Sequence, residues 1–386
     1  MARWRRNARS HRRRLGTRSA GARSRRPDRL APAGHRGNGD HGRREDGVQA
    51  AAPTGRLTMA VYTQIGAEDM AALVAEFDVG ELVSAKGIAE GVSNSNWLLD
   101  TTGRDGKGAR FILTMYEFRI ELEDLPYFLS LLDHLAGRGC AVPRTIHDRA
   151  GALYRMRGDK ALALIEFLPG VSVSEPTPAQ ARAVGTALAQ MHLASADFAG
   201  SRENGMGLAE WQRLFDACGA EGLARIDPDL AGLVAEHMPR IAAQWPADLP
   251  RSVIHADLFP DNVLMLGDKV TGLIDFYFAC NDIMAYDVAV THAAWCFDGS
   301  GRSFDPAVSA ALLEGYESVR PLLPEERAAL PLLAQGAAMR FTSSRAYDWL
   351  NTPADALVVR KDPMAFARRL QFYAANPAIF DTNAFA

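Results

Sequence analysis

The stretch at residues 251–276, RSVIHADLFPDNVLMLGDKVTGLIDF, places polar side chains among apolar runs that favour burial. Asp257 follows one short apolar run, Asn262 comes five residues later after a proline-containing turn, and Asp275 ends a third run. Carboxylate and amide oxygens are ligands of hard cations, and Mg²⁺ takes only a few of them before it completes its shell with water and phosphate. The residue types therefore indicate a site for a cation of this kind.

Short strands and a tight turn are expected to position these three side chains. The pattern predicts strands at 252–254, 263–266 and 270–275. Gly267 and Asp268 are typical of a hairpin turn. A hairpin between the second and third strands would bring Asn262 and Asp275 together. The alternative is a buried polar hairpin whose aspartates only cap turns.

The rest of the chain divides into a β-prone part and a helical part. The 386 residues are 48% apolar and 23% charged, which is ordinary globular composition. After a helix predicted at 67–79, β-prone runs at 82–84, 96–101 and 110–115 alternate with glycine-containing turns, and a second helix is predicted at 123–139. Helical patterns dominate from residue 177 onward, at 177–195, 208–217, 229–245, 306–318 and 325–350. We expect an α+β protein with a β-rich N-lobe at 59–168 and a larger, mainly helical C-lobe at 169–386.

The first 58 residues differ in composition from the rest. They hold sixteen Arg, no Lys and four acids, a local net charge of +12 in a chain whose total is −3. With almost nothing apolar to bury, this arm is expected to be disordered. It could bind nucleic acid or act as a targeting peptide. We favour an over-extended start, because Met59 opens a well-patterned segment, and therefore expect no nucleic-acid partner.

The four cysteines and the hydropathy pattern indicate in which cellular compartment the protein is expected. Cys140, Cys218, Cys280 and Cys296 lie far apart and form no C-x-x-C pair, which argues against a zinc site or a disulfide framework. No stretch approaches the ~18 consecutive apolar residues of a membrane helix. We expect a cytoplasmic protein without a membrane partner.

The segment H-A-D-L-F-P-D-N resembles the catalytic loop H-x-D-x-x-x-x-N of the protein-kinase-like fold, and Asp275-Phe276-Tyr277 stands where that fold has D-F-G. The resemblance implies that Asp257 accepts or orients the proton of a substrate hydroxyl. It implies that Asn262 and Asp275 hold Mg²⁺ against the phosphates of ATP. His255 would then be a structural hydrogen-bonding residue, and Asp261 a turn residue.

Two departures from the protein-kinase pattern narrow the class of substrate that the protein could phosphorylate. Ala256 stands where protein kinases have an arginine, so the pocket that reads a phosphorylated activation loop is missing. No A-P-E motif follows Asp275, and a helix is predicted again at 285–295. A small-molecule kinase is expected, not a protein kinase.

The resemblance also implies a nucleotide site in the N-lobe. The segment KGIAEGVSNSN at 86–96 fits a phosphate-covering loop, with Lys86, Gly87, Gly91, Ser93, Asn94 and Asn96 as binding residues. Glu166, Phe167 and Leu168 resemble the hinge whose backbone binds adenine. Thr114 occupies the slot of the phosphate-binding lysine, so Lys86 or Arg119 would supply that charge, with Glu121 or Glu123 as the partner acid.

Stretches such as GIAEGVSNSNWLL, FILTMYE, GLIDFYFACND and GAAMRFTSSRAYDW resemble bacterial homoserine kinases of the aminoglycoside-phosphotransferase-like type. The resemblance implies the reaction of ATP with L-homoserine to give ADP and O-phospho-L-homoserine, a step toward threonine. Asp282 would bind the ammonium group of the substrate. Arg340 and Arg345 would bind the carboxylate of the substrate. The two arginines could instead form a structural ion-pair face with Asp348.

Rival functions remain open from the sequence. The enzyme could phosphorylate choline, methylthioribose or an aminoglycoside, and choline would require an aromatic and acidic cage instead of arginines. A non-catalytic nucleotide-binding protein on the same scaffold is the more distant alternative. The sequence indicates nothing about oligomeric state.

Overall fold

The structure is a computed structural model, and it describes residues 65–88, 94–116, 121–352 and 360–381. The Arg-rich arm at 1–58 and the predicted nucleotide-site residues Gly91, Ser93 and Arg119 lie outside the described residues. All described residues belong to one compact unit, Leu57–Ala386.

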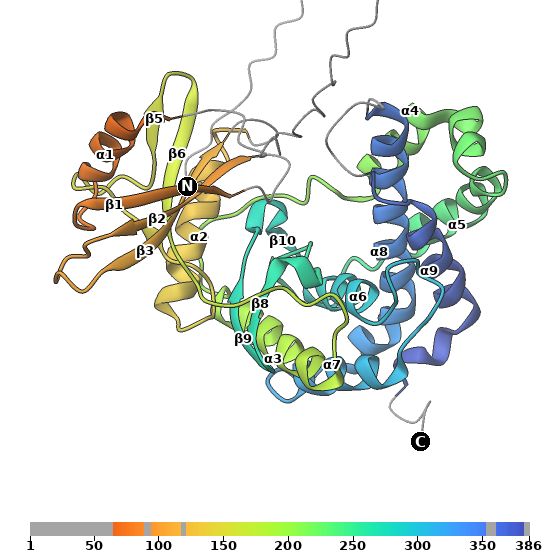
Figure 1. Cartoon of the computed structure of the whole chain (residues 1–386). Coiled ribbons are helices and arrows are strands. Elements are labelled where there is room, and N and C mark those ends of the chain that lie inside the picture. The colour runs from red at the N-terminus through yellow and green to blue at the C-terminus, as the bar shows by residue number, and fades with distance from the viewer. Residues whose placement is uncertain (1–64, 89–93, 117–120, 353–359, 382–386) are drawn as a thin grey trace, which may run out of the picture. The chain divides into compact units, whose positions relative to one another are not determined.

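An antiparallel sheet forms the N-terminal part (Figure 1). Its strands follow the order β1-β2-β3-β6-β4, and β5 pairs with β6. Their bounds are β1 (Leu82–Ile88), β2 (Asn94–Thr101), β3 (Ala109–Tyr116), β4 (Thr145–Ile146), β5 (Arg155–Arg157) and β6 (Lys160–Glu166). The glycine-containing turn at 103–108 joins β2 to β3, so the predicted alternation of strands and turns is confirmed.

The two faces of this sheet differ in chemistry because side chains alternate along each strand. One face carries Trp97, Leu99 and Leu113 and packs against helix α1 (Ala67–Ala75), which contributes Met70, Leu73 and Val74. The opposite face carries Lys86, Asn96 and Thr114, because Lys86 pairs with Leu98 across β1 and β2, and Asn96 pairs with Thr114 across β2 and β3. The sheet thus buries one face and keeps polar side chains on the other.

Helix α2 (Leu125–Gly137) contacts one end of the polar face. Its residues Leu125 and Leu129 form a small buried cluster with Tyr116 and Ala163 of the sheet. Tyr277, from the segment after Asp275, packs on the same cluster. The sheet is therefore tied directly to the segment that carries one of the predicted metal ligands.

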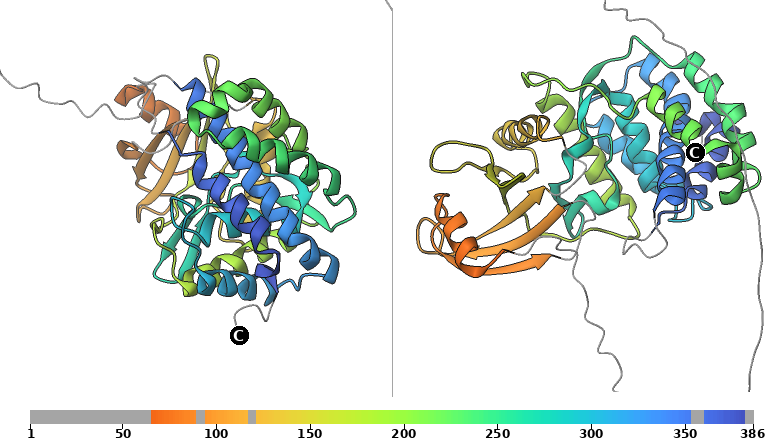
Figure 2. Two further views of the ribbon diagram at one scale, coloured as in Figure 1. Left: turned by 90° about the vertical axis from the view of Figure 1, so that its right-hand side faces the viewer. Right: turned by 90° about the horizontal axis from the view of Figure 1, so that it is seen from above.

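The remainder is mainly helical (Figures 1 and 2). The helices are α3 (Pro178–Ala194), α4 (Leu208–Ile226), α5 (Leu230–Gln244), α6 (Met284–Trp295), α7 (Pro306–Glu317), α8 (Pro324–Asn351) and α9 (Met364–Ala375). Two small antiparallel sheets lie between α5 and α6: β7 (Arg251–Ile254) pairs with β10 (Cys280–Ile283), and β8 (Val263–Leu266) forms a hairpin with β9 (Lys269–Leu273). Every residue of α6 is buried, so this helix lies inside the helical core, where it packs against α3, α7 and α8.

Several predicted boundaries were wrong for local reasons. Helix 67–79 ends at Ala75, because Phe77 instead forms a β-bridge with Asp148. Helix 208–217 continues to Ile226 across a kink at Gly219, whose φ of 63° only glycine adopts without strain. The predicted strands at 82–84 and 96–101 were too short, because β1 runs to Ile88 and β2 starts at Asn94. Among the described residues, no helix is long and apolar enough to cross a membrane.

Candidate active site

His255 follows directly after β7 and is completely buried. Its Nε2–H donates to the carbonyl of Ile274 at 2.9 Å, and its Nδ1 accepts the backbone N–H of Asp257 at 3.3 Å. Both bonds use the neutral ring, and burial lowers the pKa of His255 below its usual value. The residue thus has the structural hydrogen-bonding role that the sequence predicts.

Ala256 adopts a backbone conformation that is unusual for a residue with a side chain. Its φ is 63°, and Asp275 at 65° is the only other non-glycine residue with positive φ in the described parts of the chain. Such conformations cost about 1–3 kcal/mol each and persist only where the surroundings enforce them. Both fall in the predicted catalytic stretch, one directly before Asp257 and the other at the predicted metal ligand.

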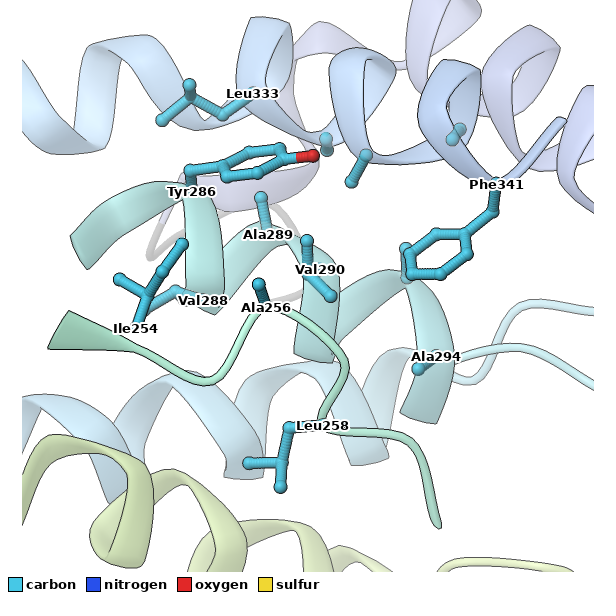
Figure 3. Packing of buried hydrophobic residues seen from close by; sticks show 14 of the residues in the cluster. Ile254, Ala256, Leu258, Tyr286, Val288, Ala289, Val290, Ala294, Leu333 and Phe341 are labelled. Atoms are coloured by element: carbon cyan, nitrogen blue, oxygen red, sulfur yellow. The ribbon is translucent and has the colours of Figure 1, made fainter. Parts of the chain in front are cut away.

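Two buried charged side chains hold the peptide groups of Ala256. The fully buried Asp287 of α6 accepts the N–H groups of His255 at 2.7 Å and of Ala256 at 2.8 Å. Arg340 of α8 donates from Nη1 to the carbonyl of Ala256. Figure 3 shows Ile254 and Ala256 beside Val288 and Val290 of α6. The buried core thereby sets the backbone that presents Asp257.

Asn262 is bonded to Asp257 in a way that leaves one oxygen available. Its Nδ2 donates to the carbonyl of Asp257 at 2.8 Å and to Oδ2 of the same residue at 3.3 Å. An amide has two donors and a separate acceptor oxygen, so Oδ1 of Asn262 remains able to bind a cation.

The predicted hairpin delivers Asp275 to the same place. Val263 of β8 pairs with Leu273 of β9, and the N–H of Ile274 donates to the carbonyl of Asn262 at 3.0 Å. Gly267 at the turn has a φ of 60°. Asp275 follows immediately in the left-handed conformation. The prediction that the hairpin brings Asn262 and Asp275 together is confirmed.

The two carboxylates of this site have perturbed proton affinities. Loss of hydration raises the pKa of Asp257 to about 7, although the charge of Arg340 opposes the shift. Loss of hydration, together with the nearby charge of Asp261, raises the pKa of Asp275 to about 6. Carboxylates that resist ionisation are typical of sites that bind a cation or a reacting group, because such a partner favours the charged form.

The donor set consists of oxygen atoms, which fit a hard cation better than a metal that prefers thiolate or imidazole ligands, such as zinc. The described residues contain no group of three or more His, Cys, Asp or Glu that could hold a metal ion. One amide oxygen and one or two carboxylates suit Mg²⁺, which is usually bound by a few protein oxygens together with substrate phosphates. Asn262 and Asp275 are the residues that would hold it.

The predicted nucleotide residues lie at the polar face and end of the sheet. Lys86 is exposed on β1, and Thr114, in the lysine slot, is buried and donates from its hydroxyl to Oδ1 of Asn96 at 2.8 Å. Asn94 is also buried, with its Oδ1 unpartnered among the described residues. Thr114 stands where the protein-kinase-like fold has its phosphate-binding lysine, and Lys86 is a cation that the described part of this face carries instead.

The predicted hinge begins at Glu166, the last residue of β6. The N–H of Glu166 donates to the carbonyl of Arg144 at 2.9 Å, so that amide is already engaged. The ring of Phe167 lies against Arg110, whose guanidinium carbon is 5.8 Å from the ring centroid. The adenine-binding prediction thus depends on the other backbone groups of 166–168.

The three predicted substrate residues have different surroundings. Asp282 of β10 is already paired, with Oδ1 at 2.9 Å from Arg251 and Oδ2 accepting from Asn204 at 2.7 Å. Arg340 is only 2% exposed. Arg345 is partly buried and donates to the carbonyl of Asp362 at 3.3 Å. Both arginines contact backbone carbonyls, and neither forms an ion pair with Asp348 within the described ranges.

Sequence reasoning missed two connections to the catalytic stretch. Asp287 is one; its signal was a lone carboxylate in the apolar helix AYDVAVTHAAW. The other is the contact between Tyr277 and Tyr116, whose hydroxyls are 3.3 Å apart and whose rings meet edge to face at 5.8 Å. No local pattern marks a contact between such distant residues.

Comparisons with known proteins agree with this site. Residues 84–322 match the phosphotransferase enzyme family, APH. The homoserine kinase of Gluconobacter oxydans (strain 621H) is 49% identical over 317 residues, which cover 82% of this chain and 98% of that protein. The homoserine kinase of Xanthobacter autotrophicus (strain ATCC BAA-1158 / Py2) is 48% identical, covering 82% and 97%.

A solved structure with low sequence identity shares the fold. The amicoumacin kinase hAmiN, in complex with AMP-PNP, Ca²⁺ and Ami, aligns with a TM-score of 0.60 at 14% identity, covering 83% of this chain and 94% of that one. The predicted two-lobed, protein-kinase-like α+β fold is confirmed. The chain belongs to the phosphotransferase enzyme family and, within it, to the homoserine kinases.

Proposed function

We propose that this protein transfers the γ-phosphoryl group of ATP to the hydroxyl of L-homoserine, producing ADP and O-phospho-L-homoserine on the route to threonine. The observation that carries the chemistry is the Asn262 amide bonded to Asp257, with Asp275 delivered beside it by the hairpin. The identity of the acceptor is supported by relatives named homoserine kinase that are nearly half identical over most of the chain.

The chain's residues take distinct roles in this reaction. The acceptor hydroxyl oxygen forms a bond to the γ-phosphorus while the bond to the bridging oxygen breaks and ADP leaves. Asp257 orients the hydroxyl and receives its proton, a role that the raised pKa of this carboxyl supports. Asn262 and Asp275 would hold Mg²⁺, which supplies charge neutralisation at the phosphates when it is bound.

The nucleotide is assigned to the N-lobe, residues 59–168, and the acceptor to the C-lobe, residues 169–386. Lys86, Gly87, Asn94 and Asn96 flank the turn between β1 and β2, where backbone groups and a cation can cover phosphates. Gly91 and Ser93 belong to the same proposal but lie outside the described residues. The backbone of Glu166, Phe167 and Leu168 would contact adenine, and Asp282, Arg340 and Arg345 are the acceptor candidates. Because this is a biosynthetic reaction of cellular metabolites, we place it in the cytoplasm.

An ADP-release assay across several acceptors tests the proposal. The panel contains L-homoserine, choline, methylthioribose and an aminoglycoside, each with and without Mg²⁺. We expect Mg²⁺-dependent turnover of homoserine and a loss of that turnover in Asp257→Ala. Turnover of another acceptor with none on homoserine would refute the assignment of the substrate, and a fully active Asp257→Ala would refute the mechanism.

A further inference from the structure

Three arginines of α8 and α9 pack on two phenylalanine rings. The guanidinium carbon of Arg340 is 4.6 Å from the centroid of Phe341, and those of Arg345 and Arg369 are 4.5 Å and 4.1 Å from the centroid of Phe366. The two rings are themselves 4.8 Å apart. We call Arg340, Arg345 and Arg369 the arginine cluster.

The three members of the arginine cluster form no ion pair with the described residues, although the charges of Asp257, Asp362 and Asp261 are near enough to favour the charged form of Arg345. None of its three members lies within ion-pair distance of a carboxylate there; each instead donates to a backbone carbonyl, of Ala256, Asp362 or Asp298. The Nε atoms of Arg340 and Arg369 are buried without a partner, and these two side chains are 2% and 4% exposed. Buried charges that lack counter-ions are costly, so an anion from outside the chain would be stabilising here.

The pKa values of Arg345 and Arg369 are consistent with the absence of an ion-pair partner. Loss of hydration and, second, repulsion from Arg369 lower the pKa of Arg345 to about 10. Loss of hydration lowers the pKa of Arg369 to about 10 as well. A bound carboxylate would relieve both causes, since it replaces lost hydration and offsets the repulsion.

The arginine cluster borders the catalytic loop. Arg340 is bonded to the carbonyl of Ala256, directly before Asp257. Arg345 lies 6.0 Å from the ring centroid of Phe259, two residues after Asp257, and Phe259 packs on Phe341 at 4.8 Å. An anion held by these arginines therefore lies beside the residue that receives the acceptor hydroxyl.

The same packing argues against a quaternary ammonium acceptor. A choline-like ligand binds over exposed aromatic faces. Here Phe341 and Phe366 are already in contact with the chain's own guanidinium groups and are buried. The site thus has the opposite charge from a choline cage.

We propose that the arginine cluster is the subsite for the α-carboxylate of the acceptor, with Arg345 as the residue that contacts it. Arg345 is the least buried of the three, and its guanidinium has only one backbone bond in the described structure. A planar guanidinium can bind a carboxylate through two parallel hydrogen bonds. Arg340 and Arg369 are more deeply buried than Arg345 and supply further positive charge. The inference rests on the proposed function, because it assumes an amino-acid acceptor.

The kinetic test compares L-homoserine with 3-aminopropan-1-ol, which keeps the hydroxyl and ammonium groups but lacks the carboxylate. For Arg345→Met we expect kcat/KM on homoserine to fall about 10- to 100-fold, mainly through KM, because a charge-assisted pair is lost. The KM for ATP and the rate on 3-aminopropan-1-ol should stay within about twofold of the starting enzyme. Arg345→Lys should recover part of the loss. The matched control is Arg213→Met, which removes an exposed arginine of α4.

A binding measurement separates this inference from the proposed function. Titration of L-2-aminobutyrate, which has the carboxylate and ammonium but no hydroxyl, is followed by calorimetry in the presence of MgADP. Binding that is lost in Arg345→Met and kept in Arg213→Met supports the subsite even if homoserine proves not to be phosphorylated. Equal affinity of Arg345→Met and the starting protein, with both folded by circular dichroism, would overturn it. An equal loss of activity on both acceptors would also overturn it.

Discussion

Asp257 is held by its neighbours in an environment that opposes its own ionisation. The buried backbone around it is held by Asp287 and Arg340, and loss of hydration raises the pKa of its carboxyl to about 7. A proton acceptor with a pKa near the working pH is well matched to its task. The strained φ of Ala256 is therefore part of the arrangement that presents this carboxylate.

The first prediction concerns the pH dependence of catalysis. Because Asp257 must be ionised to receive a proton, kcat/KM for ATP should fall tenfold per pH unit below about pH 7. The measurement is the profile from pH 5.5 to 9 at saturating homoserine. A profile that stays flat down to pH 5.5 would contradict the assignment of Asp257 as proton acceptor.

The second prediction concerns stability. The pKa of Asp257 is raised from the ordinary 3.8 to about 7 in the folded protein, so the folded state holds this proton more tightly than the unfolded chain does. Folding is therefore favoured by this group at low pH, and the benefit is lost as the pH rises from about 4 through 7. Asp257→Asn should consequently be more stable than the starting protein at pH 8, by about 1–2 kcal/mol, after a discount for the solvent that still reaches the side chain.

Urea unfolding at pH 8 and pH 5 measures this effect. The stability gain of Asp257→Asn should be clearly larger at pH 8 than at pH 5. The control is Asp268→Asn, because Asp268 is exposed at the β8–β9 turn and is not among the charges that shift the pKa of Asp257. Destabilisation of Asp257→Asn at pH 8 would contradict the prediction.

At the scale of elements, α3 and α7 approach each other through glycines. A Cβ at Gly185 of α3 would lie 2.1 Å from the carbonyl oxygen of Leu312, and a Cβ at Gly315 of α7 would lie 2.0 Å from that of Arg182. His192 of α3 donates to Asp287 at 3.0 Å, so this helix pair also supports the residue that holds Ala256. The close approach of the two helices therefore helps to position Asp287, which holds the backbone of the catalytic loop.

The third prediction tests this contact. Gly315→Ala should destabilise the protein by about 2–3 kcal/mol, because the added methyl group meets backbone that cannot move without separating the helices. Gly232→Ala is the matched control: it lies in α5 with nothing within 4 Å of the added Cβ, and it should stabilise the protein by about 0.5–1 kcal/mol. Thermal unfolding of the two variants should shift in opposite directions; equal shifts would show that α3 and α7 are free to adjust.

The elements themselves were largely predictable. Most helices from 177 onward and the β8–β9 hairpin follow from apolar periodicity and from Gly267, both of which act over a few residues. Helix α9 was not predicted. Boundaries failed where a distant partner decided them. Residues 76–79 are not helical, because Phe77 forms a β-bridge with Asp148. Residues 86–88 belong to β1, because they pair with β2.

At the scale of the whole molecule, all proposed site residues lie between Lys86 and Arg369. The fourth prediction follows: a protein that starts at Met59 should phosphorylate homoserine with kcat and both KM values within about twofold of the full chain, because none of the proposed site residues belongs to 1–58. Steady-state kinetics at 0.15 M salt measures this. A large loss of activity would show that residues 1–58 contribute to the site.

By itself, the sequence determined the reacting groups and their order. Asp257, Asn262 and Asp275 lie within nineteen residues, and a local turn is enough to bring them together, because hairpin register depends on neighbouring residues. Only the tertiary structure decided what surrounds them. Ala256 is held by residues 31 and 84 positions away, and Tyr277 meets Tyr116 across 161 positions. The arginine cluster likewise forms only when α8 packs against α9 and the catalytic loop. Whether a charged side chain is buried depends on which elements, distant in the sequence, pack against it. No local sequence pattern specifies that packing.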